Sequence, residues 1–311
     1  MSTDKFPHRV GWIGTGRMGS AIATRLLDAG VDLWVWNRTR SKAEALEVKG
    51  AKVVDTPAEL AERDIVFTMV GGPKDVLEVT FGENGVMSNP GSHPSIIIDS
   101  TTIDPMTSQD LTARAAEMGT AVLASPVSGN PKVVKSGQLT VVASGPKDAY
   151  DTAEPYLEQF GRKVTYVGAG DEARLVKIAH NLMLGVVTQS MAEITLLCEK
   201  AGVKRSDFLE FLNDSVMGST FTRYKTPAFV NLDYTPTFTS HLLRKDLELG
   251  LEASRHTDVP LPLTALTHQI VMENIGLGQG DADFANLLSR HAAASGMEIA
   301  PEGIDVPTGL E

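Results

Sequence analysis

A glycine-rich motif near the start of the chain limits the possible fold more than any other feature. The segment "VGWIGTGRMGSA" holds Gly14-x-Gly16-x-x-Gly19 between a short apolar run and an amphipathic segment. In a strand–turn–helix unit the first glycine allows the tight turn, the second lets a pyrophosphate approach the backbone, and the third lets helix and strand pack closely. The helix N-terminus adds unpaired N–H groups and a positive dipole end. The motif predicts a dinucleotide site, although a tight turn without a ligand would show the same glycines.

Apolar runs and amphipathic segments alternate up to about residue 168. Runs such as "DLWVWN", "DIVFTMV" and "SIIIDST" are typical of strands that are buried on both faces of a parallel sheet. Their alternation with helical segments predicts an α/β, Rossmann-type doubly wound sheet. After Gly170 only helical patterns follow, beginning with one helix of about thirty residues that carries apolar residues on nearly all of its faces. We expect an NADP-binding Rossmann domain over 1–168, an all-helical substrate and oligomerisation domain over 169–296, and a flexible tail over 297–311.

Composition and charge restrict the partners and the compartment. The formal net charge is −11, which disfavours nucleic acid because phosphate binding needs a basic face. The single cysteine, Cys198, excludes an intramolecular disulfide and fits a reducing compartment. There is no apolar signal core at the N-terminus and no uninterrupted apolar stretch of membrane-spanning length. We expect a cytoplasmic protein without a membrane partner, and a homodimer or homotetramer built on the long apolar helix.

The end of the second apolar run indicates which dinucleotide binds. An NAD site normally has Asp or Glu there to hold the ribose 2′-hydroxyl. This chain has "VWNRT", with Asn37, Arg38 and Thr39 in place of a carboxylate. A guanidinium can bind a 2′-phosphate in fork geometry, so we expect NADP rather than NAD, unless Arg38 is only a solvated loop residue. The cofactor-binding residues predicted from the two segments are Gly14, Thr15, Gly16, Arg17, Met18, Gly19, Asn37, Arg38 and Thr39.

A lysine in the long apolar helix is a candidate proton donor. Lys177 and Asn181 stand at i and i+4 in "ARLVKIAHNLML" and so share one helix face. A carbonyl that takes a hydride also needs a proton, and a buried lysine with a lowered pKa could supply it. The alternative is a lysine that only extends its ammonium to the surface.

Four segments resemble one enzyme family in their order and spacing. They are "GWIGTGRMGSAIATRLLDAG", "ASPVSG" followed by "SGQL", "GDEARLVKIAHN" and "RKDLELGLEA". Over about residues 8–292 the chain resembles the β-hydroxyacid dehydrogenases, most closely the NADPH-dependent glyoxylate and succinic semialdehyde reductase branch. The resemblance implies an NADP-dependent enzyme that interconverts a small hydroxy acid and its aldehyde acid. It also implies a small substrate that carries a carboxylate.

The resemblance assigns roles to the residues nearest the chemistry. Lys177 falls on the catalytic general acid/base of the family, and Asn181 on its helper, which holds the lysine and the substrate. Ser128 and the backbone N–H of Gly129 fall on the groups that bind the substrate carboxylate. We therefore expect Lys177, Asn181 and Ser128 to be the catalytic residues.

Other roles concern the walls of the implied site. Phe238 falls on an aromatic residue of the substrate pocket, and Lys245 on a lysine that closes over cofactor and substrate. Thr101 falls on a residue at the nicotinamide. Met69 and Val70 fall on the loop beside the adenosine ribose. No metal ligands are expected.

The chain departs from the family pattern at three places. Asn130 replaces a glycine of the usual "SGG", and "VGG" at 70–72 replaces a common "LP". Because of these two departures, the resemblance does not identify the substrate. His180 stands where many members have Asn; we interpret it as structural because it lies off the Lys177 face, with a catalytic role as the alternative.

Two other functions remain open. One is a dinucleotide-binding scaffold without turnover, which the presence of Lys177, Asn181, Ser128 and Lys245 disfavours. The other is an imine reductase, a class that resembles this family but usually lacks the lysine.

Overall fold

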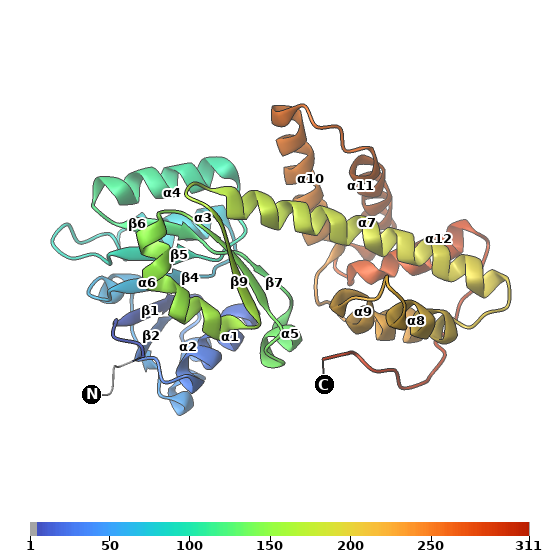
Figure 1. Cartoon of the computed structure of the whole chain (residues 1–311), viewed down its shortest axis with the longest axis horizontal. Helices are drawn as coiled ribbons and strands as arrows, with labels where there is room; N and C mark the ends of the chain where they lie inside the picture. The colour runs from blue at the N-terminus through green and yellow to red at the C-terminus, as the bar shows by residue number, and fades with distance from the viewer. Residues whose placement is uncertain (1–4, 311) are drawn as a thin grey trace. The chain divides into compact units, whose positions relative to one another are not determined.

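Nine strands form one sheet within residues 5–310, the part of the chain that this computed structural model describes. The strand order is β3-β2-β1-β4-β5-β6-β8-β7, with β9 paired to β8 (Figure 1). The six strands from β3 to β6 run parallel, whereas β8 is antiparallel to β6 and β7. The predicted doubly wound α/β fold is confirmed. The strands are β1 (Val10–Ile13), β2 (Leu33–Trp36), β3 (Lys52–Val53), β4 (Ile65–Thr68), β5 (Ile96–Asp99), β6 (Ala121–Ala124), β7 (Val127–Ser128), β8 (Thr140–Ser144) and β9 (Lys163–Gly168).

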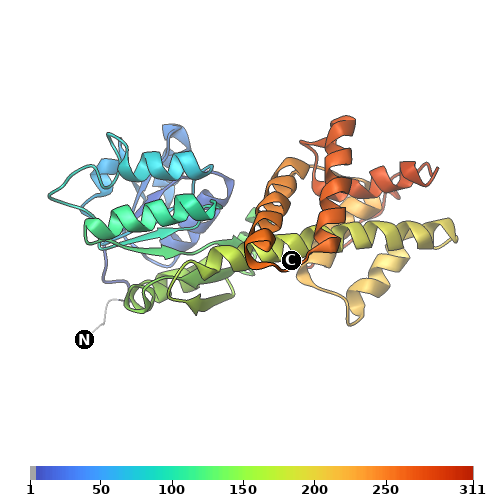
Figure 2. The same cartoon turned by 90° about the horizontal axis from the view of Figure 1, so that it is seen from above.

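Helices cover both faces of this sheet. Figure 2 shows α3 and α4 side by side on one face, where a cluster of buried apolar side chains joins them to β1, β4 and β5. All four residues of each of these strands are buried, because helices pack on both sides. The helices of this unit are α1 (Arg17–Asp28), α2 (Arg40–Glu44), α3 (Pro73–Phe81), α4 (Pro105–Glu117), α5 (Pro131–Lys135) and α6 (Lys147–Leu157).

The second unit is all-helical within the described residues. Two clusters of buried apolar side chains form its core: one joins α7 to α8, α9 and α12, and the other joins α7 to α10 and α11. In Figure 1, α10 and α11 lie side by side, and they pack against each other. The helices are α7 (Glu172–Lys200), α8 (Arg205–Asp214), α9 (Thr220–Asn231), α10 (Ser240–Thr257), α11 (Pro262–Asn274) and α12 (Leu287–Ala294).

The division between the units falls inside α7. The first unit ends at Lys177 and the second begins at Ile178, whereas the sequence places the boundary near residue 168. The difference arises because the first turn of α7 is bonded to the α/β unit. The Ala173 N–H donates to Ser144 Oγ at 3.0 Å, and Arg174 pairs with Asp99. The first turn of α7 and its lysine therefore belong to the α/β unit.

The long helix α7 passes a length-and-composition test for a membrane span. Half of the apolar window that passes the test is buried, and Ala192 and Leu196 of this helix belong to a core cluster. A packed core helix passes the same test. We therefore interpret α7 as a packed helix, which also explains why apolar residues lie on nearly all of its faces.

The sequence patterns did not single out α5 or α9. The polar stretch after Ser128 contains α5, because Asn130 caps the helix and Pro131 occupies its first turn. The helix α9 gave little sequence signal, because Pro227 lies inside it and proline normally ends a helix. A capping box between Ser219 and Thr222 starts this helix.

The C-terminal segment, predicted to be a flexible tail, makes specific contacts with the helical unit. Glu302 accepts a hydrogen bond from the Arg205 N–H at 2.8 Å, and Asn231 Nδ2 donates to the Ile304 carbonyl at 2.8 Å. Val306 packs against a core cluster. The many Pro, Gly and acidic residues of this segment suggested a flexible chain. Instead, the carboxylate of Glu302 caps the start of α8.

Candidate active site

The glycine loop lies where parallel strands end together. Ile13 of β1 pairs with Trp36 of β2 and with Thr68 of β4, so the residues that follow these strands meet at one edge of the sheet. The Gly14 N–H donates to the Trp36 carbonyl at 2.9 Å. In open α/β sheets ligands bind at the carboxyl ends of the strands. The structure therefore places the motif where a dinucleotide binds in this fold.

Each of the three glycines in the motif is there for a different physical reason. Gly14 has φ +101°, and a Cβ there would collide with the Met69 carbonyl. A Cβ on Gly19 would collide with the Gly14 carbonyl, so these two glycines are required by packing. At Gly16 a Cβ would meet no atom within 4 Å. The space beside Gly16 is therefore open on the protein side, as close approach of a pyrophosphate requires.

The N-terminus of α1 fits a phosphate group. Gly16 is its N-cap and offers no side-chain hydrogen bond to the first turn, and no acidic residue lies in that turn. The first N–H groups of a helix lack intrahelical partners and attract anions. The residues present thus suit a dinucleotide, held by the backbone of the Gly14–Gly19 loop.

Asn37 fastens the second loop to the glycine loop. Its Oδ1 accepts from the Thr15 N–H at 2.9 Å, and its Nδ2 donates to the Thr39 carbonyl at 2.9 Å. The predicted residues Thr15, Asn37 and Thr39 are therefore brought together. Next to them, the exposed Arg38 forms an ion pair with Asp75 of α3, at 3.1 Å from Nη1 to Oδ1.

The residue predicted at the nicotinamide and the two predicted beside the adenosine ribose also meet in the α/β unit. Thr101 is buried just after β5, and its Oγ1 accepts from the Val70 N–H at 3.1 Å. Val70 follows Met69, whose N–H donates to the Ile13 carbonyl at 2.9 Å. The backbone N–H groups of Met69 and Val70 thus join these three predicted residues to the end of β1.

Ser128 and Gly129 lie at the end of β7. Gly129 has φ +140°, and a Cβ there would lie 2.8 Å from Val133 Cγ1, so backbone and packing both demand glycine. Asn130 Oδ1 accepts from the N–H groups of Lys132 and Val133 at 2.9 and 3.1 Å. The unusual asparagine is therefore explained as the cap of α5.

Lys177 is half-buried on α7 and ends the α/β unit. Three residues earlier, Arg174 Nη1 donates to the Thr101 carbonyl at 3.0 Å. A helix rises about 1.5 Å per residue, so Lys177 stands about 4.5 Å further along the axis. The predicted proton donor is therefore about one turn from a direct contact with the nicotinamide-side loop.

In the helical unit, Asn181 lies one helical turn after Lys177 on α7. The buried Asn181 Nδ2 donates to Asp246 Oδ2 at 2.6 Å, and its Oδ1 lies 2.9 Å from His180 Nδ1. Lys245 Nζ lies 3.4 Å from Asp246 Oδ1. Asp246 therefore joins the predicted residues Asn181 and Lys245 and fixes the direction of the amide. His180 is placed as a neighbour of Asn181.

Phe238 is held by a buried ion pair. Its N–H donates to Asp283 Oδ2 at 3.3 Å, and Lys225 Nζ donates to Asp283 Oδ1 at 2.5 Å. Burial lowers the pKa of Lys225, although Asp283 opposes the shift. Burial alone would raise the pKa of Asp283, but Lys225 and hydrogen bonds from Thr237 and Ala285 outweigh it and lower the pKa. The pair therefore keeps the backbone at Phe238 in place.

Several charged residues of these networks, Asp246, Asp99 and Arg174 among them, were not predicted from the sequence. Asp246 stands beside Lys245 in "RKDL", and that adjacency was a usable signal. Asp99 and Arg174 are far apart in sequence and looked like an ordinary strand end and an ordinary helix residue.

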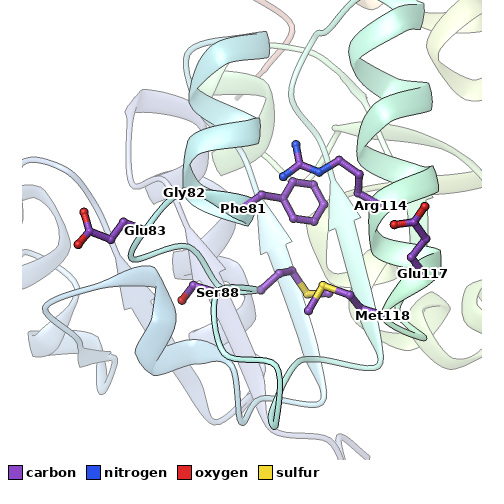
Figure 3. Close-up of a pocket in the computed structure, with 8 residues that line it drawn as sticks. Phe81, Gly82, Glu83, Ser88, Arg114, Glu117 and Met118 are labelled. Carbon is purple, nitrogen blue, oxygen red and sulfur yellow. The ribbon is translucent and has the colours of Figure 1, made fainter.

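A cavity elsewhere in the α/β unit is lined by none of the predicted site residues. It has a volume of about 420 Å³ and lies between the end of α3 and the second half of α4. In Figure 3 the Arg114 guanidinium lies over the Phe81 ring, 3.9 Å from its centroid. In a parallel sheet the C-terminal ends of the crossover helices lie at the amino ends of the strands. This cavity is therefore at the opposite end of the sheet from the glycine loop.

No group of three or more His, Cys, Asp or Glu side chains among residues 5–310 is arranged to hold a metal ion.

Comparison with known proteins agrees with this geometry. Residues 9–168 match the family model of the NAD-binding domain of 6-phosphogluconate dehydrogenase. Residues 168–290 match a model described as the NAD-binding domain of NADP-dependent 3-hydroxyisobutyrate dehydrogenase. Together the two models cover nearly all of the two units.

Individual relatives cover similar lengths. An uncharacterised oxidoreductase, YfjR of Bacillus subtilis, is 34% identical over 90% of this chain and 98% of its own. Glyoxylate/succinic semialdehyde reductase 2 of Arabidopsis thaliana is 29% identical over 93% of this chain and 81% of its own. A crystal structure of 3-hydroxyisobutyrate dehydrogenase from Salmonella typhimurium has a TM-score of 0.80 and 26% identity, covering 90% of this chain and 99% of its own.

The chain belongs to the β-hydroxyacid dehydrogenase family, which confirms the resemblance of the four sequence segments. It is an oxidoreductase that uses a nicotinamide dinucleotide.

The open space at Gly16 generates a first prediction. Gly16→Ala should leave the thermal midpoint nearly unchanged, because a methyl group there meets no protein atom within 4 Å. It should weaken NADPH binding at least about tenfold, which corresponds to 1.4 kcal/mol, because the methyl group occupies the space that the pyrophosphate needs. NADPH fluorescence and calorimetry measure the two quantities. Gly19→Ala is the comparison and should lower stability itself. Unchanged NADPH affinity in Gly16→Ala would contradict the placement of the phosphates.

Proposed function

We propose that the protein is an NADP-dependent reductase of a small aldehyde acid, or a dehydrogenase of the corresponding hydroxy acid. The observation that carries this proposal is the bond between Arg174 and Thr101, which fixes the first turn of α7 at the carboxyl end of β5. This bond holds the helix that bears Lys177 on the edge of the sheet that carries the glycine loop. The names of the Arabidopsis and Salmonella relatives support a short acid as the substrate class.

Proton transfer is the task proposed for Lys177. When bound, the nicotinamide supplies a hydride to the carbonyl carbon or accepts one in the reverse direction. In the reduction, Lys177 Nζ gives its proton to the carbonyl oxygen, and the oxygen becomes the hydroxyl of the product. In the oxidation the same nitrogen takes the proton back. Asn181, held by Asp246, supports the lysine.

Binding of the substrate carboxylate is the task proposed for Ser128 and Gly129. A hydroxyl and a backbone N–H donate well to an anion, and the missing side chain at Gly129 allows close approach. Asn130 gives its Oδ1 to the α5 N-terminus. We therefore assign it to the shape of this loop rather than to substrate polarity.

The second prediction separates the roles of Lys177 and Ser128. With glyoxylate or succinic semialdehyde as substrate, Lys177→Ala should lower kcat by about 10²–10⁴, the usual contribution of a positioned general acid. NADPH binding should change little. Ser128→Ala should mainly raise KM, because it removes a contact made in ground and transition states alike. Lys177→Arg should not restore turnover, since a guanidinium stays protonated. If Lys177→Ala keeps most of its kcat and loses only substrate affinity, the lysine is an anion anchor and not the acid.

NADP is the proposed cofactor in preference to NAD. No carboxylate follows β2, where Asn37, Arg38 and Thr39 stand. Arg38 is exposed, and its ion-pair partner among residues 5–310 is the partly exposed Asp75. Exposed ion pairs are weak, so a 2′-phosphate with two negative charges can take the place of this carboxylate.

The third prediction follows from that ion pair. Arg38→Ala should weaken NADPH about 10- to 100-fold, the range for one hydrogen bond to a charged group, and should leave NADH nearly unchanged. Asp75→Asn is the matched control: it removes the competing carboxylate and should not weaken NADPH. Titrations of both cofactors against both variants provide the measurement. Comparable use of NADH and NADPH by the unmodified protein would overturn the proposed preference.

Self-association is proposed for the helical unit. Met183 and Leu197 of α7 are 70% and 66% exposed, and Leu263 and Leu266 of α11 are exposed as well. Large apolar side chains exposed in such number usually mark an interface. A second copy of the chain, in a symmetric homodimer or homotetramer, is the proposed partner.

The fourth prediction tests this assembly. At micromolar concentration, light scattering should give a mass of two or four chains. Leu197→Glu should shift the distribution towards the monomer, because a carboxylate would be buried in the interface. Glu210→Lys on α8, an exposed polar position, serves as the control. A monomeric mass for the unmodified protein would contradict the proposal.

A further inference from the structure

A buried ion pair joins the start of α7 to the end of β5. Arg174 is 5% exposed and Asp99 is fully buried, with 2.9 Å between Nη2 and Oδ2. The other oxygen of Asp99 accepts from Thr68 Oγ1 at 2.6 Å and from the Thr101 N–H at 3.2 Å. One carboxylate therefore ties the ends of β4 and β5 to the helix.

The remaining nitrogens of Arg174 have partners as well. Nη1 donates to the Thr101 carbonyl at 3.0 Å, and Nε donates to Ser108 Oγ at 2.6 Å. Nε also lies 3.0 Å from Asp171 Oδ1, which accepts from Ser108 Oγ at 2.8 Å. The guanidinium thus contacts β5, the loop after it, α4 and the turn before α7 from one position.

This cluster reaches the residues at which the cofactor is expected. Thr101 is held at both its N–H and its carbonyl, and its hydroxyl accepts from the Val70 N–H at 3.1 Å. On the other side of the cluster, Lys177 follows Arg174 by three residues on the same helix. Arg174 is therefore the side chain that connects the lysine's helix to the nicotinamide-side loop.

Stability alone is a weak reason for such a cluster. Burying two charges is costly, and apolar side chains of similar volume often stabilise a protein as well or better. A guanidinium differs from them because its N–H groups point in fixed directions and impose an orientation. The cluster is thus better suited to setting geometry than to adding stability.

We propose that Arg174 is a positioning residue, which fixes the first turn of α7 on the ends of β4 and β5 and so aligns Lys177 with the two loops that carry Val70 and Thr101. The inference rests on the proposed role of Lys177 as the proton donor. It adds that the acid works at its full rate only while the Arg174 cluster holds its helix.

Arg174→Lys and a matched variant, Arg205→Lys, test the proposal. Arg205 is also buried, at 1% exposure, and pairs with Glu199 in the helical unit. The Arg174→Lys ammonium can still neutralise Asp99, but it cannot reach all the groups that the Arg174 guanidinium contacts. We expect kcat with glyoxylate or succinic semialdehyde to fall about 10- to 100-fold, the range for a displaced reacting group. The KM values and the NADPH affinity should stay within about threefold, below the tenfold change that 1.4 kcal/mol represents. Arg205→Lys should lower the thermal midpoint as much but keep kcat.

Hydrogen exchange in the cofactor-free full-length protein gives a second readout. The amides of Val70 and Thr101 bond within the cluster. They should exchange faster in Arg174→Lys and not in Arg205→Lys. If Arg174→Lys does not fold, Ser108→Ala replaces it, since that variant removes one contact of the guanidinium without a charge change.

The outcomes separate this inference from the proposed function. An unchanged kcat in Arg174→Lys overturns the positioning role. The same result in Ser108→Ala does so where that variant is used instead. A loss of kcat in Arg205→Lys as large as that in Arg174→Lys also overturns it. If Lys177→Ala retains its kcat, the role of Lys177 fails, and with it the alignment assigned to Arg174. A kcat loss confined to the Arg174 cluster, together with faster exchange at Val70 and Thr101, supports the positioning role.

Discussion

The ion pair of Arg174 and Asp99 lies where strand ends, cofactor loops and the long helix come together. Its carboxylate bonds to the Thr68 hydroxyl and the Thr101 N–H, and its guanidinium bonds to the Thr101 carbonyl. Because both charges are buried, the loss of either partner would leave the other uncompensated, which is strongly unfavourable. The position of Lys177 on α7 therefore depends on contacts made at the end of the parallel sheet.

Much of the fold follows from local patterns in the sequence. Apolar runs buried on both faces, the glycines at 14, 16 and 19, and a 29-residue apolar helix each have a direct physical signature. The cap formed by Asn130 before Pro131 could have been predicted as well, because this pair is typical of a helix start. The helix that contains Pro227 could not, since packing overrides its poor helix propensity.

The site was predicted less completely than the fold, because its connections are tertiary. The role of Lys177 was inferred from its place in an apolar helix and from the family resemblance, and the role of Ser128 from the resemblance. Both stay predictions, whereas the glycine loop has a local reason for each glycine. Three helices (α4, α5 and α6) and four strands (β6 to β9) separate Asp99 from Arg174 in the sequence, and no periodicity links them. The topology of the sheet brings these buried charges together. A single sequence therefore shows which charged residues are present but not which of them pair.

The central claim is that this chain reduces a short aldehyde acid with a hydride taken directly from NADPH. Deuterium labelling tests it most directly. The full-length protein is incubated with NADPH that carries deuterium at both C4 positions and with glyoxylate or succinic semialdehyde, and the hydroxy acid is examined by mass spectrometry. The account predicts one deuterium on the carbon that carries the new hydroxyl group. A product without deuterium, or no product from either aldehyde acid while NADPH binds, would contradict it.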